Sequence, residues 1–123
     1  MVDVTHLFFE FLANIKYAHL LSKTYTEHKA TDKLYNSIDD LYDKFLEVYI
    51  GIYGVKNIKT KKHINLNAHN GNISQYIKTI IKKIDLIYKK QDNDLKSILD
   101  EMKIEINQCL YILNLLDNRF KSV

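Results

Sequence analysis

Several residue types that interrupt or cross-link chains are scarce in this sequence. Its 123 residues contain no proline and no tryptophan, only three glycines, and a single cysteine. With so few residues that break regular structure, the chain is expected to form long helices. The lone Cys109 excludes a disulfide within the chain, and its apolar neighbours favour a reduced thiol in the core.

Long apolar runs and a strong charge of one sign are also missing. No apolar stretch is long enough to span a membrane, and the first residues carry acids where an export signal carries basic residues. The net charge is +3, with lysines spread among acids, unlike a strongly basic nucleic-acid-binding protein. We therefore expect one cytoplasmic domain over residues 1–123, with DNA binding absent or weak.

Apolar residues recur at helical spacing in four segments. The first covers residues 3–22, and a turn at 23–26, where Thr24 or Thr26 serves as N-cap, leads to a second that ends near Tyr53, before Gly54. Two further helices are expected over residues 73–90 and 95–120. The sequence thus predicts an all-α protein, a four-helix bundle.

The connection between the second and third helices is long. Residues 55–72 are polar, rich in lysine and asparagine, and poor in helical periodicity. About 18 extended residues reach about 60 Å, more than the length of about 40 Å expected for the second helix. The chain can therefore return to the other end of the bundle through a long crossover, as in ferritin-like bundles. An up-down-up-down bundle would need only a short link here.

The second helix presents two different faces. The apolar face comprises Leu34, Ile38, Leu41, Phe45, Val48 and Ile52. The opposite face carries one histidine and four carboxylates: His28, Asp32, Asp39, Asp43 and Glu47. Crowded carboxylates repel one another, and a cation or the basic side chains of a partner would relieve that repulsion. Carboxylates with imidazoles suit iron, manganese or zinc, whereas a solvated acidic face is the ordinary alternative.

The direction of two of these side chains implies a second subunit. Asp43 and Glu47 point away from the apolar face of their own helix, so a metal bound there needs ligands from a second chain. His19 continues the apolar stripe of the first helix, where a buried histidine with satisfied ring nitrogens is the ordinary alternative. A two-fold axis could bring His19 and His28 of one chain to Asp43 and Glu47 of the other. The remaining histidines, His6, His63 and His69, are expected on the surface.

The segment AHLLSKTYTEHKATDKLYNSIDDLYDKFLEVYIGIYG resembles part of the Dps-like mini-ferritins, and small phage-encoded ferritin-like proteins of unassigned function. His19 follows Ala18, similar to the Ala-His that supplies an iron ligand in that family. His28 and Asp32 match a histidine and aspartate four residues apart, and Asp43 and Glu47 match a later Asp-x-x-x-Glu pair. The lysine-rich N-terminal tail that binds DNA in some members is absent.

The resemblance implies a ferroxidase-type site between two subunits, in a homo-oligomer that is at least a dimer and up to a dodecamer. Its metal ligands would be His19, His28, Asp32, Asp43 and Glu47. Iron would be the metal, with zinc or manganese as substitutes, and Fe²⁺ would be oxidised by peroxide or oxygen. The alternative is a non-catalytic helical interaction protein, such as a phage accessory or assembly factor, that has lost the metal chemistry. A weaker third hypothesis is nucleic-acid binding through the lysines of residues 73–90.

Overall fold

The computed structural model describes residues 4–59, 63–67 and 73–121, with side chains as far as residue 115. It contains the helices α1 (Val4–Leu20), α2 (Tyr25–Tyr53), α3 (Ile73–Tyr88) and α4 (Asn93–Lys121), with a 3-10 turn, η1 (Val55–Asn57), after α2. No strand occurs in the described ranges, so the predicted all-α fold class is confirmed. The predicted helix start at Asp3 and parts of the predicted connection, 60–62 and 68–72, lie outside the described residues.

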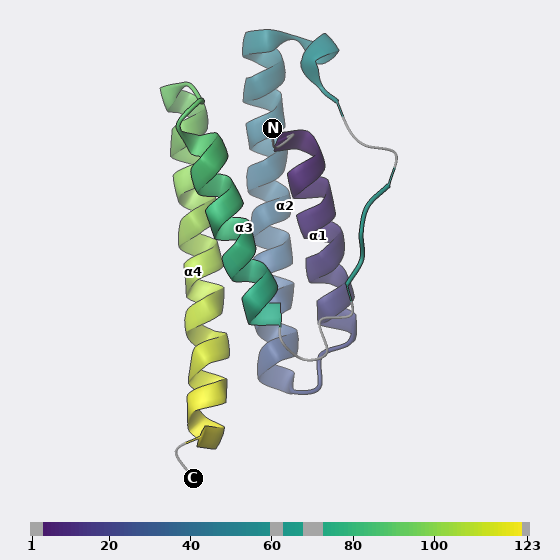
Figure 1. Ribbon diagram of the computed structural model, residues 1–123, viewed down its shortest axis with the longest axis vertical. Helices are drawn as coiled ribbons and strands as arrows, with labels where there is room; N and C mark the ends of the chain where they lie inside the picture. The colour runs from purple at the N-terminus through teal and green to yellow at the C-terminus, as the bar shows by residue number, and fades with distance from the viewer. Residues whose placement is uncertain (1–3, 60–62, 68–72, 122–123) are drawn as a thin grey trace.

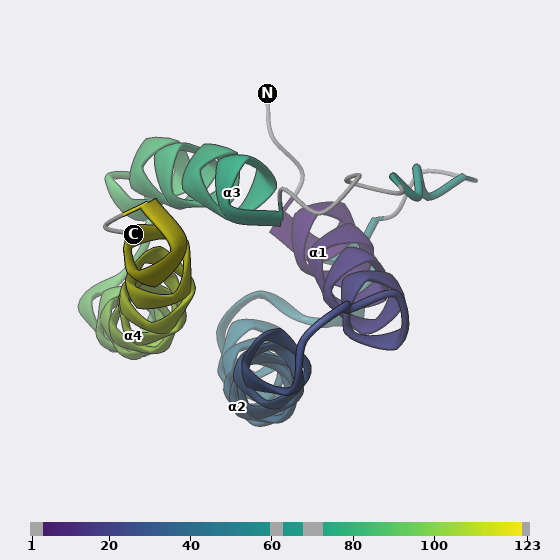
Figure 2. The same cartoon turned by 90° about the horizontal axis from the view of Figure 1, so that it is seen from below.

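The direction of the helices confirms the long crossover. Figure 1 shows α1 and α2 antiparallel, α3 parallel to α2, and α4 antiparallel to α3. Since α2 and α3 run the same way, the chain must return along the bundle between them. Seen end-on in Figure 2, α2 lies between α1 and α4, and α3 lies opposite α2, between α4 and α1.

The crossover is fastened to α1 by a buried asparagine. Asn14 is fully buried, and its Nδ2 donates to the carbonyls of Asn65 and Glu10, both at 2.8 Å. Its Oδ1 accepts the N–H of Asn67 at 2.9 Å, and the Glu10 carboxylate accepts the N–H of Asn65 at 3.2 Å. A buried amide is tolerated because its donors and acceptor are satisfied, and these bonds hold residues 63–67 along α1.

The core combines apolar residues from all four helices. On α2, Leu34, Ile38 and Phe45 are buried as predicted, and Cys109 of α4 is buried too. The predicted apolar face was wrong at Ile52, which is 46% exposed. The reason is length: α2 continues past the start of α1, so nothing from α1 covers its last turns. Tyr42 is instead part of the core, and its hydroxyl donates to the Thr5 carbonyl at 2.7 Å.

Most helix ends lie within two residues of the predicted positions. Thr24, rather than Thr26, caps α2: its Oγ1 accepts the N–H of Glu27 at 3.1 Å. Gly54 follows α2 with a φ of 84°, the left-handed region that suits glycine. α1 ends two residues earlier than predicted, at Leu20, and α4 begins two residues earlier, at Asn93. Within the described ranges, none of the helices has both the length and the apolar character to cross a membrane.

Candidate metal-binding site

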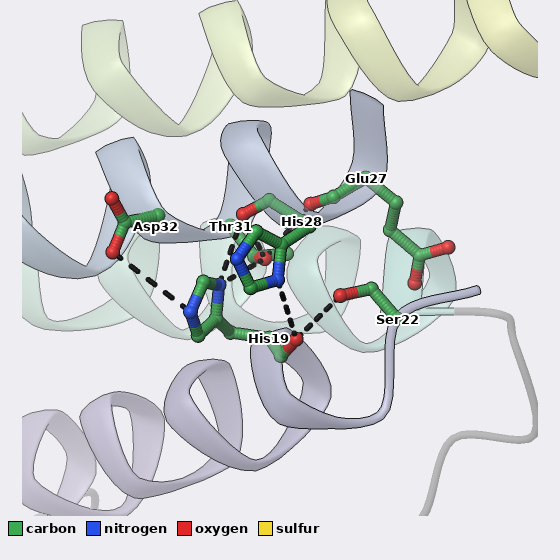
Figure 3. A network of polar contacts seen from close by, with 6 residues as sticks. All are labelled: His19, Ser22, Glu27, His28, Thr31 and Asp32. Carbon is green, nitrogen blue, oxygen red and sulfur yellow. Dashed lines mark hydrogen bonds and ion pairs between the residues drawn. The ribbon is translucent and has the colours of Figure 1, made fainter. Parts of the chain in front are cut away.

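The α1–α2 turn brings two of the predicted ligands together. His19 lies near the end of α1 and His28 in the first turn of α2. Their rings stack, with centroids 3.9 Å apart and an angle of 26° between the planes. His19 is only 8% exposed, whereas His28 is open to solvent. The site therefore has one buried imidazole covered by an accessible one (Figure 3).

Reciprocal hydrogen bonds fix the orientation of both rings. His19 Nδ1 lies 2.9 Å from the carbonyl oxygen of His28, and His28 Nδ1 lies 3.3 Å from the carbonyl oxygen of His19. A carbonyl only accepts, so each Nδ1 carries the proton, and in the neutral ring each Nε2 keeps its lone pair. The Ser22 hydroxyl also donates to the His19 carbonyl. Both imidazoles are thus held in the tautomer that a metal ligand bonding through Nε2 requires.

A third predicted ligand lies beside the pair. His19 Nε2 is 4.0 Å from Oδ1 of Asp32, whose side chain is 47% exposed. In Figure 3, the second ring nitrogens of His19 and His28 face the side on which Asp32 lies. Two imidazoles and one carboxylate are ligand types that suit Fe²⁺, Mn²⁺ or Zn²⁺, although within the described part of one chain these three are not arranged to hold an ion.

The other two predicted ligands are not part of this cluster within one chain. Asp43 and Glu47 are exposed, further along α2. Asp43 lies about 22 Å along the helix from His28, at 1.5 Å per residue. In the described part of one chain, no group of three or more His, Cys, Asp or Glu side chains is arranged to hold a metal ion. That a second chain supplies Asp43 and Glu47 stays a prediction.

Sequence reasoning missed two features of the histidines. Thr31 is buried behind His19, with Oγ1 3.3 Å from His19 Nδ1, and donates to the Glu27 carbonyl at 2.8 Å. Its position three residues after His28 was the available signal. His6, expected on the surface, is only 9% exposed, with Nε2 3.2 Å from Oε2 of Glu10. The crossover bonds to Glu10 beside it, and helical periodicity cannot indicate that contact.

Comparison with known proteins finds one family model and one phage protein that resemble the chain, both of unknown function. Residues 19–113 match the model of a family of unknown function (DUF5856). The match begins at His19 and includes all five predicted ligands. An uncharacterized 14.6 kDa protein encoded in the mobD-ri intergenic region of Enterobacteria phage T4 is 31% identical over 98 residues, which cover 80% of this chain and 75% of the phage protein. No solved structure matches the chain.

Proposed function

The chain belongs to this family of unknown function, and we propose that it binds Fe²⁺ between two copies and oxidises it to Fe³⁺. His19, His28 and Asp32 of one copy would bind the ion together with Asp43 and Glu47 of the other. Zinc and manganese would bind the same donors as substitutes. If the chain is phage-encoded, the reaction would take place in the host cytoplasm, where iron and peroxide meet.

The observation that carries this proposal is the locked histidine pair. Because each Nδ1 donates to the backbone of the other histidine, both Nε2 lone pairs lie on the side of Asp32. An ordinary core histidine needs its polar atoms satisfied but has no need of a second imidazole stacked on it. Backbone carbonyls that orient a ring in this way are typical partners of metal-binding histidines.

A second copy would complete the donor set. Asp43 and Glu47 are exposed and four residues apart, so their carboxylates lie on one face of α2. An isologous pairing of two chains would make two equivalent sites, each with both carboxylates and both imidazoles. A dimer is the smallest assembly that satisfies the proposal, and a dodecameric shell remains what the mini-ferritin resemblance implies.

The chemistry requires one electron from each iron. Two Fe²⁺ ions would give two electrons to one hydrogen peroxide molecule, which is cleaved to two hydroxide ions. Asp32, Asp43 and Glu47 would stabilise the Fe³⁺ product, because carboxylate oxygens prefer the harder, more highly charged ion. The two imidazoles would fix the position of the ion before oxidation.

Anaerobic addition of Fe²⁺ followed by peroxide tests the proposal. We expect ferric absorbance to rise quickly with wild-type protein. His28→Ala loses a proposed ligand, so its iron affinity should fall at least about 10-fold and its ferric absorbance should rise more slowly. The matched control is His63→Ala, which changes an exposed histidine of the crossover and should behave as wild type. Identical time courses of ferric absorbance for wild type and His28→Ala would contradict the proposed oxidation.

Metal analysis separates this proposal from the non-catalytic alternative. If purified protein holds no iron, zinc or manganese, and none of these ions raises its melting temperature, the results favour the hypothesis of a phage accessory or assembly factor. Sedimentation of Asp43→Asn should then show the same oligomeric state with and without metal.

A further inference from the structure

A broad cleft opens at the end of the bundle opposite the α1–α2 turn. α1 has 17 residues and α2 has 29, so α2 is about 18 Å longer at 1.5 Å per residue. The hydrogen bond from Tyr42 to Thr5 marks the level at which α1 begins, and the turns of α2 beyond it have no α1 neighbour. The resulting cleft, of about 1320 Å³, lies between the start of α1, the end of α2, the crossover and the end of α3.

Positive charge dominates the lining of this cleft. Lys59 of the crossover and Lys83 and Lys90 of the α3 end line it. Lys83 lies on α3 and Lys90 in the turn that follows it, and both line the same cleft. None of the three forms an ion pair within the described ranges. Three uncompensated ammonium groups around one cleft create a favourable site for an anion.

The one carboxylate among the described lining residues is already engaged. Glu10 accepts the N–H of Asn65 at 3.2 Å, and its Oε2 also lies 3.2 Å from His6 Nε2. These contacts hold the carboxylate against the crossover. The lysines are therefore left to bind an anion from outside the chain.

Aromatic rings form one wall of the cleft. Phe45, Tyr49 and Tyr53 recur every four residues on α2, with ring centroids 6.2 Å apart for the first pair and 4.9 Å for the second. Phe45, at one end of the row, is fully buried, whereas Tyr53, at the other end, is 42% exposed. The Tyr53 hydroxyl donates to Asp92 Oδ2 at 2.5 Å, which fixes the ring from outside the cleft. The Phe45 and Tyr49 rings are nearly parallel and the Tyr53 ring is tilted by 50° to Tyr49, so the wall ends in one partly exposed ring whose hydroxyl is held.

We infer that this cleft binds a phosphorylated ligand that carries a flat ring, the chemistry of a nucleotide, either free or within single-stranded nucleic acid. The ammonium groups of Lys59, Lys83 and Lys90 bind phosphate oxygens, and the exposed aromatic ring stacks on the base. A purely apolar ligand would leave the lysines unpaired and partly desolvated, and inorganic phosphate would leave the aromatic wall unused. The cleft shares no residue with the proposed iron site, so either proposal can fail alone.

Calorimetric titration of the full-length protein at physiological salt tests the ligand class. The probes are ADP, adenosine, inorganic phosphate and a thymidine oligonucleotide of about six bases. We expect ADP to bind with a Kd of about 10–100 µM, and adenosine and phosphate each at least about tenfold more weakly. Oligonucleotide binding tighter than ADP binding assigns the site to single strands, and the reverse assigns it to free nucleotides. Absence of binding by ADP and oligonucleotide up to about 1 mM overturns the inference.

Two pairs of lysines from α3 and the turn after it give a matched control. Lys83→Gln with Lys90→Gln should weaken binding at least about tenfold, because both ammonium groups line the cleft. Lys78→Gln with Lys82→Gln removes the same charge from exposed positions of α3 outside the cleft, and should weaken binding less than about twofold. Equal losses from the two pairs would overturn the site, since binding would then follow net charge alone.

The aromatic wall needs its own variant. Tyr53→Ala removes a partly exposed ring and should weaken ADP binding about tenfold while circular dichroism shows an unchanged fold. Inorganic phosphate should bind this variant as it binds wild type. If ADP binding is unchanged in Tyr53→Ala, the stacking half of the inference is wrong.

Discussion

At the α1–α2 turn, residues 21–24 join two helices that pack closely, whereas at the opposite end α2 continues beyond the start of α1 and has no α1 neighbour. The turn end brings together His19 and His28, which are nine residues apart in the chain. The open end collects side chains from α1, α2, α3 and the crossover around a cleft. The first site is small and held by short-range hydrogen bonds; the second is wide and depends on contacts between distant segments.

This difference predicts that the two ends respond separately to mutation. A change that loosens the crossover should affect the open end and leave the histidine pair in place. A change at the start of α2 should affect the histidine pair and leave the open end unchanged. Variants at Asn14 and Thr24 test this separation, and the buried thiol of Cys109 tests the packing of the core between the two ends.

Asn14→Ala should have the largest effect. It removes the amide that holds Asn65 and Asn67 to α1, so the free energy of unfolding should fall by about 2–3 kcal/mol in urea titrations. Asn36→Ala, at an exposed position of α2, is the control and should change it by less than about 0.5 kcal/mol.

Amide hydrogen exchange sharpens that test. In Asn14→Ala, the N–H of Asn67 should exchange faster because its acceptor is gone, while the NMR signals of the His19 and His28 rings stay in place. If the histidine signals shift as much as those of Asn67, the two ends are coupled and the comparison fails.

Thr24→Ala should have an intermediate effect, at the turn end. It removes the side chain that caps α2, and we expect the free energy of unfolding to fall by about 1–2 kcal/mol. Thr26→Ala changes an exposed threonine two residues later and should be nearly neutral. Equal losses in the two variants would mean that the cap contributes nothing specific.

Between pH 9 and pH 10, the stability lost through Cys109 should be the smallest of the three effects. Burial raises the pKa of this thiol from 9.0 to about 12. Above pH 9 the unfolded chain releases the proton and the folded chain keeps it, so stability falls as pH rises toward 12, by about 1 kcal/mol between pH 9 and pH 10. Cys109→Ala should reduce this fall relative to wild type; parallel stability curves for the two proteins would contradict the assignment.

Short-range rules predicted much of the fold. The scarcity of helix breakers, the apolar periodicity, the Thr24 cap and Gly54 identified four helices, and the length of the link identified the crossover. His28 and Asp32 share a face because four residues make about one helical turn. The two errors in burial, at Ile52 and His6, both fall where coverage depends on a segment far away in the chain.

What the sequence determined by itself is therefore local: which residues form helices, where these helices are capped, and which side chains share a face. The tertiary structure alone decided which faces are covered and which partners meet. It placed Asn14 under the crossover, and it stacked His19 on His28 with both Nδ1 atoms bonded to backbone carbonyls. It also left a cleft where α2 extends beyond the start of α1. The physical reason is that periodicity and capping act within one or two turns, whereas these contacts join segments whose relative position is set by the packing of the whole bundle.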